Sequence, residues 1–233
     1  MKFTTLVKPL TRQTLSTDVH QQLRDLLMNG RVMPGEVLSL RTVAEALSVS
    51  VMPVREAVHR LVAEQALELT ANRTLRVPTL TVSQFREITS IRIQLECMAT
   101  GLAAQNMGED CIKTIEGIHV RFAKEISRTK PDESKLIALN KELHFAIYKQ
   151  SGLPILLQMI ESLWLRIGPI LNYDLRSGSE RVTKHIQASH HDQLVAALRK
   201  KDPVAATAAL RKDIQSAADF IVSTTALVTA DNT

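Results

Sequence analysis

Residues 41–65 read RTVAEALSVSVMPVREAVHRLVAEQ, and this stretch decides the fold of the first third of the chain. Its apolar side chains recur every three or four residues on both sides of a short break at 48–50, which is the period of an α-helix. The spacing predicts two helices with Ser39 and Ser50 as their N-caps, and Pro53 is tolerated because it falls in a first turn. Two helices joined by so short a break indicate a helix-turn-helix.

The flanking sequence extends this pair to a winged helix-turn-helix. Helical spacing over 14–29 predicts one more helix before it. After it, the apolar period changes to two over 67–70 and 74–77, which predicts a small β-hairpin. Arg73 at the tip of the hairpin and Arg76 beside it would give this wing a basic edge.

The rest of the chain is predicted to be entirely helical, because no later stretch alternates between apolar and polar residues. Glycine and proline breaks divide it into helices over 83–105, 110–129, 132–151, 154–173, 179–200 and 203–224. The expected fold class is mainly α. An N-terminal arm, a winged helix-turn-helix domain and an all-α helical bundle are predicted over 1–13, 14–78 and 79–233.

Composition places the chain among globular proteins, since 45% of its 233 residues are apolar and 23% are charged. No apolar run approaches the ~18 residues of a membrane span, and the first residues lack the apolar core and cleavage site of a secretory signal. The two cysteines are too few for a disulfide framework and lack metal-ligand spacing, which agrees with a reducing compartment. We therefore expect a cytoplasmic protein without a membrane partner.

Charge indicates that the first third is the part that meets a polyanion. The net charge is +5, and residues 1–80 hold ten basic and seven acidic side chains. Aromatic residues make up only 3%, so stacking of single-stranded bases is poorly supported, while contact with duplex DNA stays open. On the predicted recognition helix, Arg55 could pair with a guanine, and Arg41 could hold the backbone or an adjacent base. The alternative is a solvated arginine on an ordinary helix pair.

Four polar side chains fall among apolar ones in the predicted bundle. Asn140 and His144 are four residues apart and share one helix face, while His191 and Asp213 lie on the last two helices. A carboxylate among alanines and leucines is costly unless it is paired, hydrogen-bonded or bound to a cation. Spacing alone leaves two alternatives open: buried groups that satisfy one another, which is favoured, or a divalent metal held by two imidazoles, an amide oxygen and a carboxylate.

Three segments resemble the DNA-binding domain of the GntR family of bacterial transcription regulators: PGEVLS at 34–39, TVAEALSVSVMPVREAVHRLVAEQALEL at 42–69 and ANRTLRVP at 71–78. In this family, an arginine usually follows the serine at the start of the recognition helix. Here Val51 follows it, which could touch a thymine methyl but cannot bind phosphate, so the operator is expected to differ from the commonest family sites. The wing also lacks the usual glycine. The residues expected at the DNA are Arg41, Ser50, Val51, Met52, Arg55, Asn72, Arg73 and Arg76.

Further segments resemble the all-α FCD effector domain of the FadR-like branch of this family: Arg92-x-x-Leu95-Glu96, Asn140-x-x-x-His144, His191 followed by Leu194-x-x-Ala197, and Asp202-x-x-Ala205-Ala206. Many FCD domains hold a metal, and the resemblance implies that its ligands here are Asn140, His144, His191 and Asp213. Asp213 stands where a histidine is usual. Because a carboxylate can also bind zinc, nickel or manganese, we expect either an altered metal preference or an empty site.

The same resemblance implies a small organic-acid effector near the metal. Arg92 falls where the family places an arginine that faces the pocket, and its guanidinium could pair with the carboxylate of the effector. A structural ion pair with Glu96, one helical turn away, is the alternative for this arginine.

Together these features predict a homodimeric transcription regulator, expected to be a repressor and not an enzyme. The first domain would read a pseudo-palindromic operator in double-stranded DNA at the nucleoid, and the second would dimerise and bind the effector, which controls DNA affinity. A divalent metal is expected, and no organic cofactor. One alternative is a DNA-binding regulator with a degenerate, metal-free pocket. A metal-dependent hydrolase is disfavoured, because no serine, cysteine or second carboxylate stands out beside the cluster as a nucleophile or base.

Overall fold

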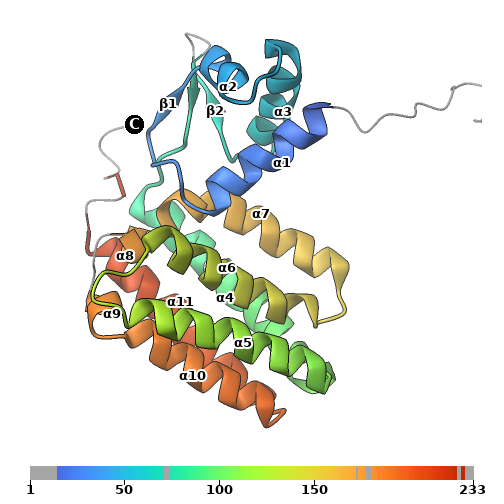
Figure 1. The fold of residues 1–233 in the computed structure, drawn as a ribbon, viewed down its shortest axis with the longest axis vertical. Helices are drawn as coiled ribbons and strands as arrows, with labels where there is room; N and C mark the ends of the chain where they lie inside the picture. Colours follow the sequence, from blue (N-terminus) through green and yellow to red (C-terminus); the bar gives the residue numbers. More distant parts are fainter. Residues whose placement is uncertain (1–14, 71–73, 172, 177–179, 225–226, 229–233) are drawn as a thin grey trace, which may run out of the picture.

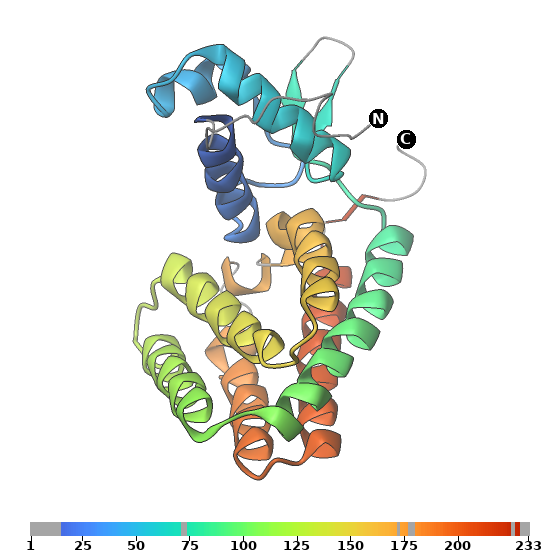
Figure 2. The same ribbon diagram turned by 90° about the vertical axis from the view of Figure 1, so that its right-hand side faces the viewer.

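The structure is a computed structural model that describes residues 15–70, 74–171, 173–176, 180–224 and 227–228. Two parts are stacked along the long axis, a smaller one with short strands above a helical bundle (Figures 1 and 2). The fold class is mainly α, as predicted. The predicted arm over 1–13 lies outside the described residues.

The upper part contains three helices: α1 (Leu15–Met28), α2 (Leu40–Ala46) and α3 (Val51–Ala63). Ser39 caps α2 as expected, because its Oγ accepts a hydrogen bond from the Thr42 amide at 3.0 Å. Ser50 is the N-cap residue of α3, but its side chain makes no capping hydrogen bond within the described chain. The apolar stripes of α1 and α3 pack together, with Leu23 and Leu61 buried between them.

Three two-residue strands form the wing: β1 (Val37–Leu38), β2 (Glu68–Leu69) and β3 (Leu75–Arg76). They are antiparallel in the order β1-β3-β2, so that Arg76 lies opposite both Val37 and Glu68. The sequence predicts the hairpin of β2 and β3 but not β1, because two residues are too few to show an alternation. The tip of the wing, with Asn72 and Arg73, lies outside the described residues.

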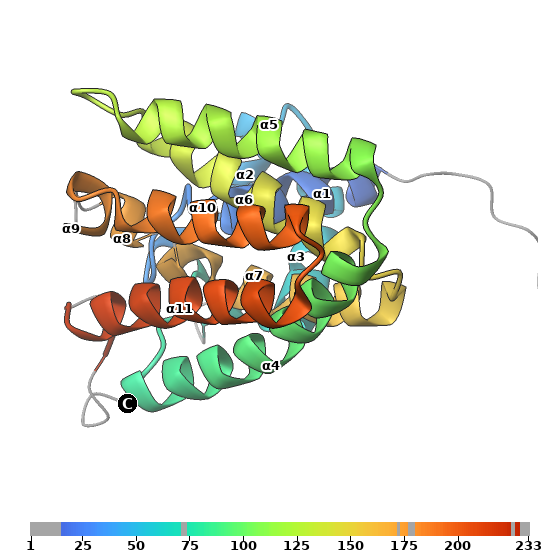
Figure 3. The same ribbon diagram turned by 90° about the horizontal axis from the view of Figure 1, so that it is seen from below.

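The lower part is a bundle of helices: α4 (Val82–Asn106), α5 (Glu109–Ile126), α6 (Glu133–Lys149), α7 (Pro154–Leu171), α8 (Tyr173–Arg176), α9 (Glu180–Thr183), α10 (Ile186–Arg199) and α11 (Pro203–Val222). Helix α4 runs beside α11 and also contacts α6 and α7, while α10 packs between α5 and α11 (Figure 3). The prediction of one helix over 179–200 is wrong. His185 adopts a left-handed backbone with φ of +53°, at which a right-handed helix cannot continue, so α9 and α10 are separate.

Helix α7 is the one helix of the described chain that is long and apolar enough to cross a membrane by length and composition. The sequence shows no such uninterrupted run because Glu161 and Arg166 fall within it. Half of the helix is buried against its neighbours, including Trp164 and Leu165. The core helix of a soluble protein passes the same test.

The two parts of the molecule touch where the end of α1 rests on α7 (Figure 1). A Cβ atom on Gly168 of α7 would come within 2.5 Å of the carbonyl oxygen of Leu27, so only glycine allows this approach. Beside it, Nζ of Lys141 on α6 donates to Asp25 Oδ1 at 3.3 Å and to Asn29 Oδ1 at 3.2 Å. Helices α6 and α7 of the bundle therefore both contact α1 directly.

Candidate functional site

Three of the eight residues predicted to meet DNA come together at one open surface of α2 and α3. Arg41, Val51 and Arg55 line the same open cavity of about 500 Å³, whose other walls are mostly apolar side chains of α2, α3 and β2. Met52 and Arg55 are exposed, and the Arg41 side chain is 85% exposed. Nε of Arg41 donates to Glu45 at 3.0 Å. Such an exposed pair contributes only ~0.2–0.5 kcal/mol, so this arginine can exchange its partner for a phosphate.

The remaining expected contacts have different surroundings. The hydroxyl of Ser50 is exposed at the start of α3 and, within the described chain, takes no part in capping, which suits a phosphate contact. Arg76 is already paired, since its Nε donates to Glu68 Oε1 across the two strands. Asn72 and Arg73 belong to the undescribed tip of the wing.

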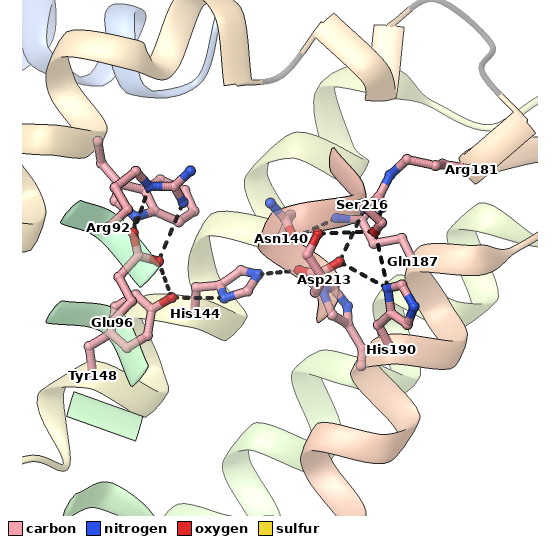
Figure 4. A network of polar contacts seen from close by, with 12 residues as sticks. Arg92, Glu96, Asn140, His144, Tyr148, Arg181, Gln187, His190, Asp213 and Ser216 are labelled. Carbon is pink, nitrogen blue, oxygen red and sulfur yellow. Dashed lines mark hydrogen bonds and ion pairs between the residues drawn. The ribbon is translucent and has the colours of Figure 1, made fainter. Parts of the chain in front are cut away.

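Three of the four predicted metal ligands meet inside the bundle, and Figure 4 labels two of them, His144 and Asp213. The ligand atoms of His144 on α6, His191 on α10 and Asp213 on α11 all lie within 4.8 Å of one another, and all three side chains are buried. Nε2 of His144 lies 3.4 Å from Asp213 Oδ2, and Nε2 of His191 lies 3.6 Å from the same oxygen. One carboxylate oxygen therefore faces two imidazole nitrogens.

This donor set fits a divalent metal ion. His191 is fully buried, yet neither ring nitrogen has a hydrogen-bond partner among the described residues, and an unpartnered buried polar atom is costly. Burial lowers the pKa of His191, which keeps the imidazole neutral. Burial alone would raise the pKa of the Asp213 carboxyl, but the neighbouring histidines hold it well below its usual value. A neutral imidazole and an ionised carboxylate are the forms that bind zinc, nickel or manganese.

Asn140, the fourth predicted ligand, borders the same cluster from α6. Its Oδ1 accepts a hydrogen bond from Gln187 Nε2 at 2.9 Å, and an amide oxygen keeps a second lone pair for another partner. The cavity shared by Asn140, His144 and Asp213 measures only about 20 Å³. This volume admits one ion or one water molecule, so an organic acid finds no room there in this conformation.

The second oxygen of Asp213 is engaged by Arg181, a residue that no sequence pattern singles out. Nη2 of Arg181 donates to Asp213 Oδ1 at 3.1 Å, and Nη1 donates to Ser216 Oγ. His190 Nδ1 lies 3.7 Å from the same Oδ1, while His185 is exposed and does not belong to the cluster. The buried guanidinium neutralises Asp213, as the alternative of mutually satisfied buried groups requires.

Arg92 is paired with Glu96 and also lines the small cavity that borders Asn140, His144 and Asp213. Its Nε and Nη2 donate to the two carboxylate oxygens at 2.6 and 3.3 Å, and both side chains are buried. Trp164 Nε1 donates to Glu96 at 3.0 Å and the Tyr148 hydroxyl donates at 2.5 Å. This hydroxyl lies 3.1 Å from Nδ1 of His144, so the ion pair is continuous with the metal-ligand cluster (Figure 4). The sequence shows neither aromatic contact, because both partners are more than 50 residues away.

Known protein families match both parts of the chain. The family described as "Bacterial regulatory proteins, gntR family" matches residues 15–77, and the FCD domain matches residues 87–216. The HTH-type transcriptional regulator McbR of Escherichia coli (strain K12) is 35% identical over 190 residues, which cover 81% of this chain and 84% of McbR. A solved structure of E. coli McbR/YncC has a TM-score of 0.83 at 30% identity and covers 91% of this chain and 98% of that one.

More distant relatives are transcription regulators as well. The HTH-type transcriptional repressor GlaR of E. coli (strain K12) is 26% identical over 213 residues, which cover 85% of this chain and 92% of GlaR. A regulator from Rhodococcus sp. RHA1 shares the fold, with a TM-score of 0.71 at 21% identity over 89% of this chain and 97% of that one. The chain therefore belongs to the GntR family of bacterial transcriptional regulators, in the FadR-like branch that carries an FCD domain, and is not an enzyme.

Proposed function

We propose that this protein binds a DNA operator through α3 and the wing, and that a small organic acid bound in the bundle controls this binding. The observation that carries the proposal is the exposed face on which Arg41, Val51 and Arg55 share one cavity. The first turn of a recognition helix is the part that reaches base edges in the major groove. The direct contact of α1 with α6 and α7 supports the coupling of the two parts.

Arg55→Ala is expected to lower operator affinity about ten- to hundredfold and to relax the preference at one base pair. A bidentate arginine–guanine contact contributes ~1–3 kcal/mol of discrimination, which sets this range. The operator is first selected from a random duplex pool, and binding is then titrated at one fixed salt concentration. Arg121→Ala is the control, because Arg121 is exposed on α5 and pairs with Glu142, far from α3 in the chain. Full affinity and unchanged preference in Arg55→Ala would contradict the assignment.

A homodimer on a pseudo-palindromic operator is part of the proposal. Exposed apolar side chains on two adjacent helices support it, namely Ile91 and Met98 on α4 with Ile155 and Met159 on α7. A second copy of the chain would cover them.

The relatives named as repressors favour repression as the mode of action. The relatives of this chain are bacterial regulators, which implies a cytoplasmic location. Operator binding would place the protein at the nucleoid. The titration of the protein with its operator DNA also measures the stoichiometry, which we expect to be two chains per operator.

A divalent metal in the bundle is the second part of the proposal. His144, His191 and Asp213 would hold the ion, with Asn140 as a further oxygen ligand. The ion would bind one of the two ring nitrogens that His191 leaves unpartnered in the described chain, and an acidic effector would reach its positive charge only in a conformation with more room than the present cavity of about 20 Å³. No organic cofactor is proposed.

Zinc, nickel or manganese added to chelator-treated protein is expected to raise the midpoint of thermal unfolding. A ligand at about a hundred times its Kd stabilises the native state by ~2.7 kcal/mol. His191→Ala and Asp213→Asn should abolish this shift, while His185→Ala should retain it, because His185 is exposed and outside the cluster. A shift that survives in both cluster variants would place the metal elsewhere.

A regulator with a metal-free pocket is the second candidate, and specific contacts favour it. Arg181 already supplies a positive charge to Asp213, and Arg92 is already paired with Glu96. No shift with any of the three metals would select this candidate. The DNA-binding half of the proposal would remain, since it depends on α2, α3 and the wing alone.

A further inference from the structure

A cavity of about 600 Å³ lies between α4 and α11, apart from the metal-ligand cluster. The two helices lie side by side (Figure 3), and the cavity opens between the first half of α4 and the last half of α11. Its volume is within the ~300–1,000 Å³ of ordinary small-molecule sites. The cavity beside the metal ligands has only about 20 Å³. Room for an organic ligand therefore exists at α4 and α11 and not at the cluster.

The cavity carries two positive charges that are available to a ligand. Arg86 on α4 and Arg211 on α11 both line it, and neither guanidinium has an ion pair or hydrogen bond with another residue of the described chain. The acidic residue of the lining, Asp219, already accepts a hydrogen bond from Gln215 Nε2 at 2.8 Å. Two guanidinium groups at one cavity suit a carboxylate, which they can bind through paired hydrogen bonds.

A buried hydroxyl in the same lining lacks a partner. Thr89 is only 4% exposed, and within the described residues its Oγ1 makes no hydrogen bond. Leaving such a group unsatisfied costs free energy that a ligand atom would recover. Beside it, Ile93, Ala218 and Val222 give the cavity an apolar portion. A bare inorganic anion would leave this portion uncovered, whereas an organic body would fill it.

We propose that this cavity binds an organic acid, with its carboxylate at Arg86 and Arg211, its apolar body on the α4 and α11 side chains, and a polar atom at Thr89. The site is distinct from the metal-ligand cluster and goes beyond the function proposed above. Arg86 lies close to the start of α4, which follows the connection to the DNA-binding part. Val228 pairs with this connection, its amide donating to Leu80 O at 3.0 Å. A ligand here would brace α4 against α11 at the base of the DNA-binding part.

The test measures thermal unfolding and direct titration of the full-length protein with three acids and their neutral amides: benzoate, phenylacetate and hexanoate against benzamide, phenylacetamide and hexanamide. Inorganic phosphate is the anion without an apolar body. At least one acid is expected to bind about tenfold more tightly than its amide and than phosphate, because the charged hydrogen bonds distinguish them. Arg211→Gln should lose this preference, and Lys212→Gln should keep it, because Lys212 is the exposed neighbour outside the lining.

Two further variants make the result independent of charge. Ser90→Trp should block binding without disturbing the core, because Ser90 is exposed at the rim. Thr89→Val should weaken binding several-fold while leaving the free protein at least as stable, since it replaces an unpartnered hydroxyl by a methyl group of similar shape. Thr100→Val is the matched control, because Thr100 has the same kind of unpartnered buried hydroxyl on α4 but does not line the cavity.

His144→Ala separates this proposal from the metal-dependent function. Binding that survives in His144→Ala and is lost in Arg211→Gln and Ser90→Trp supports the cavity. Binding that is lost in His144→Ala and kept in Arg211→Gln would place the acid at the cluster and overturn the proposal. The same conclusion follows if no acid binds, if phosphate binds as well as the acids, or if Ser90→Trp dissociates a dimer, which would show that a second copy fills the cavity.

Discussion

Replacing Glu96 by alanine is expected to lower the free energy of unfolding by about 3–5 kcal/mol, the usual cost of removing one partner of a buried ion pair. Glu96 is fully buried and Arg92 is 3% exposed, so the guanidinium would keep its charge with little access to water. Trp164 and Tyr148 would lose their acceptor in the same step. One substitution therefore takes the acceptor from three donors, of which only Tyr148 keeps another neighbour, Nδ1 of His144 at 3.1 Å, which is why its effect should be among the largest in the molecule.

The measurement is chemical unfolding of Glu96→Ala and of Glu45→Ala. Glu45 is the matched control, because it pairs with Arg41 at the same spacing of four residues on an exposed helix surface. Its loss should change the stability by no more than ~0.5 kcal/mol. The double variant Arg92→Leu with Glu96→Leu should recover much of the lost stability, since it removes the unpaired charge. A Glu96→Ala protein as stable as Glu45→Ala would show that this buried pair contributes nothing.

Local periodicity explains why most of the fold could be predicted. The apolar side chains of α1, α2 and α3 recur at a spacing that places them on one buried face of each helix. The short break between α2 and α3 indicates a helix-turn-helix. Strand β1 could not be predicted, because its two residues are defined by hydrogen bonds to β3, far along the chain. The end of α9 was missed for a related reason. Nothing in the local sequence requires His185 to take the left-handed backbone that it adopts.

The sequence likewise predicted some residues of the candidate sites and missed others. The four-residue spacing of Asn140 and His144 predicted a shared helix face, and the structure brings His144 together with His191 and Asp213. Arg181 could not be expected at this cluster, because only the folded path of α9 brings it to Asp213. The cavity between α4 and α11 is equally invisible in the sequence. Its lining comes from two helices that are more than a hundred residues apart.

Gly168→Ala is expected to displace the DNA-binding part from the bundle and to lower stability by about 1–3 kcal/mol, the usual cost of overpacking. The added Cβ would lie 2.5 Å from Leu27 O and 2.9 Å from Met28 Cα. Both are backbone atoms of the last turn of α1. No side-chain rotation relieves the clash, so the helix itself must move. Thermal unfolding measures the loss. Gly117→Ala is the control, because Gly117 lies inside α5 and a Cβ there meets no other atom within 4 Å.

The two glycine variants should differ in sign. Gly117→Ala should stabilise the protein by up to ~1 kcal/mol, since alanine favours a helix over glycine, and should leave DNA binding unchanged. Gly168→Ala should also alter operator affinity, because α1 packs directly on α3 and would carry its displacement to the recognition helix. One turn before Gly168, the same helix α7 carries Trp164, which bonds to Glu96 in the buried network. If Gly168→Ala matched Gly117→Ala in both stability and operator affinity, the contact between α1 and α7 would carry no coupling between the bundle and the DNA.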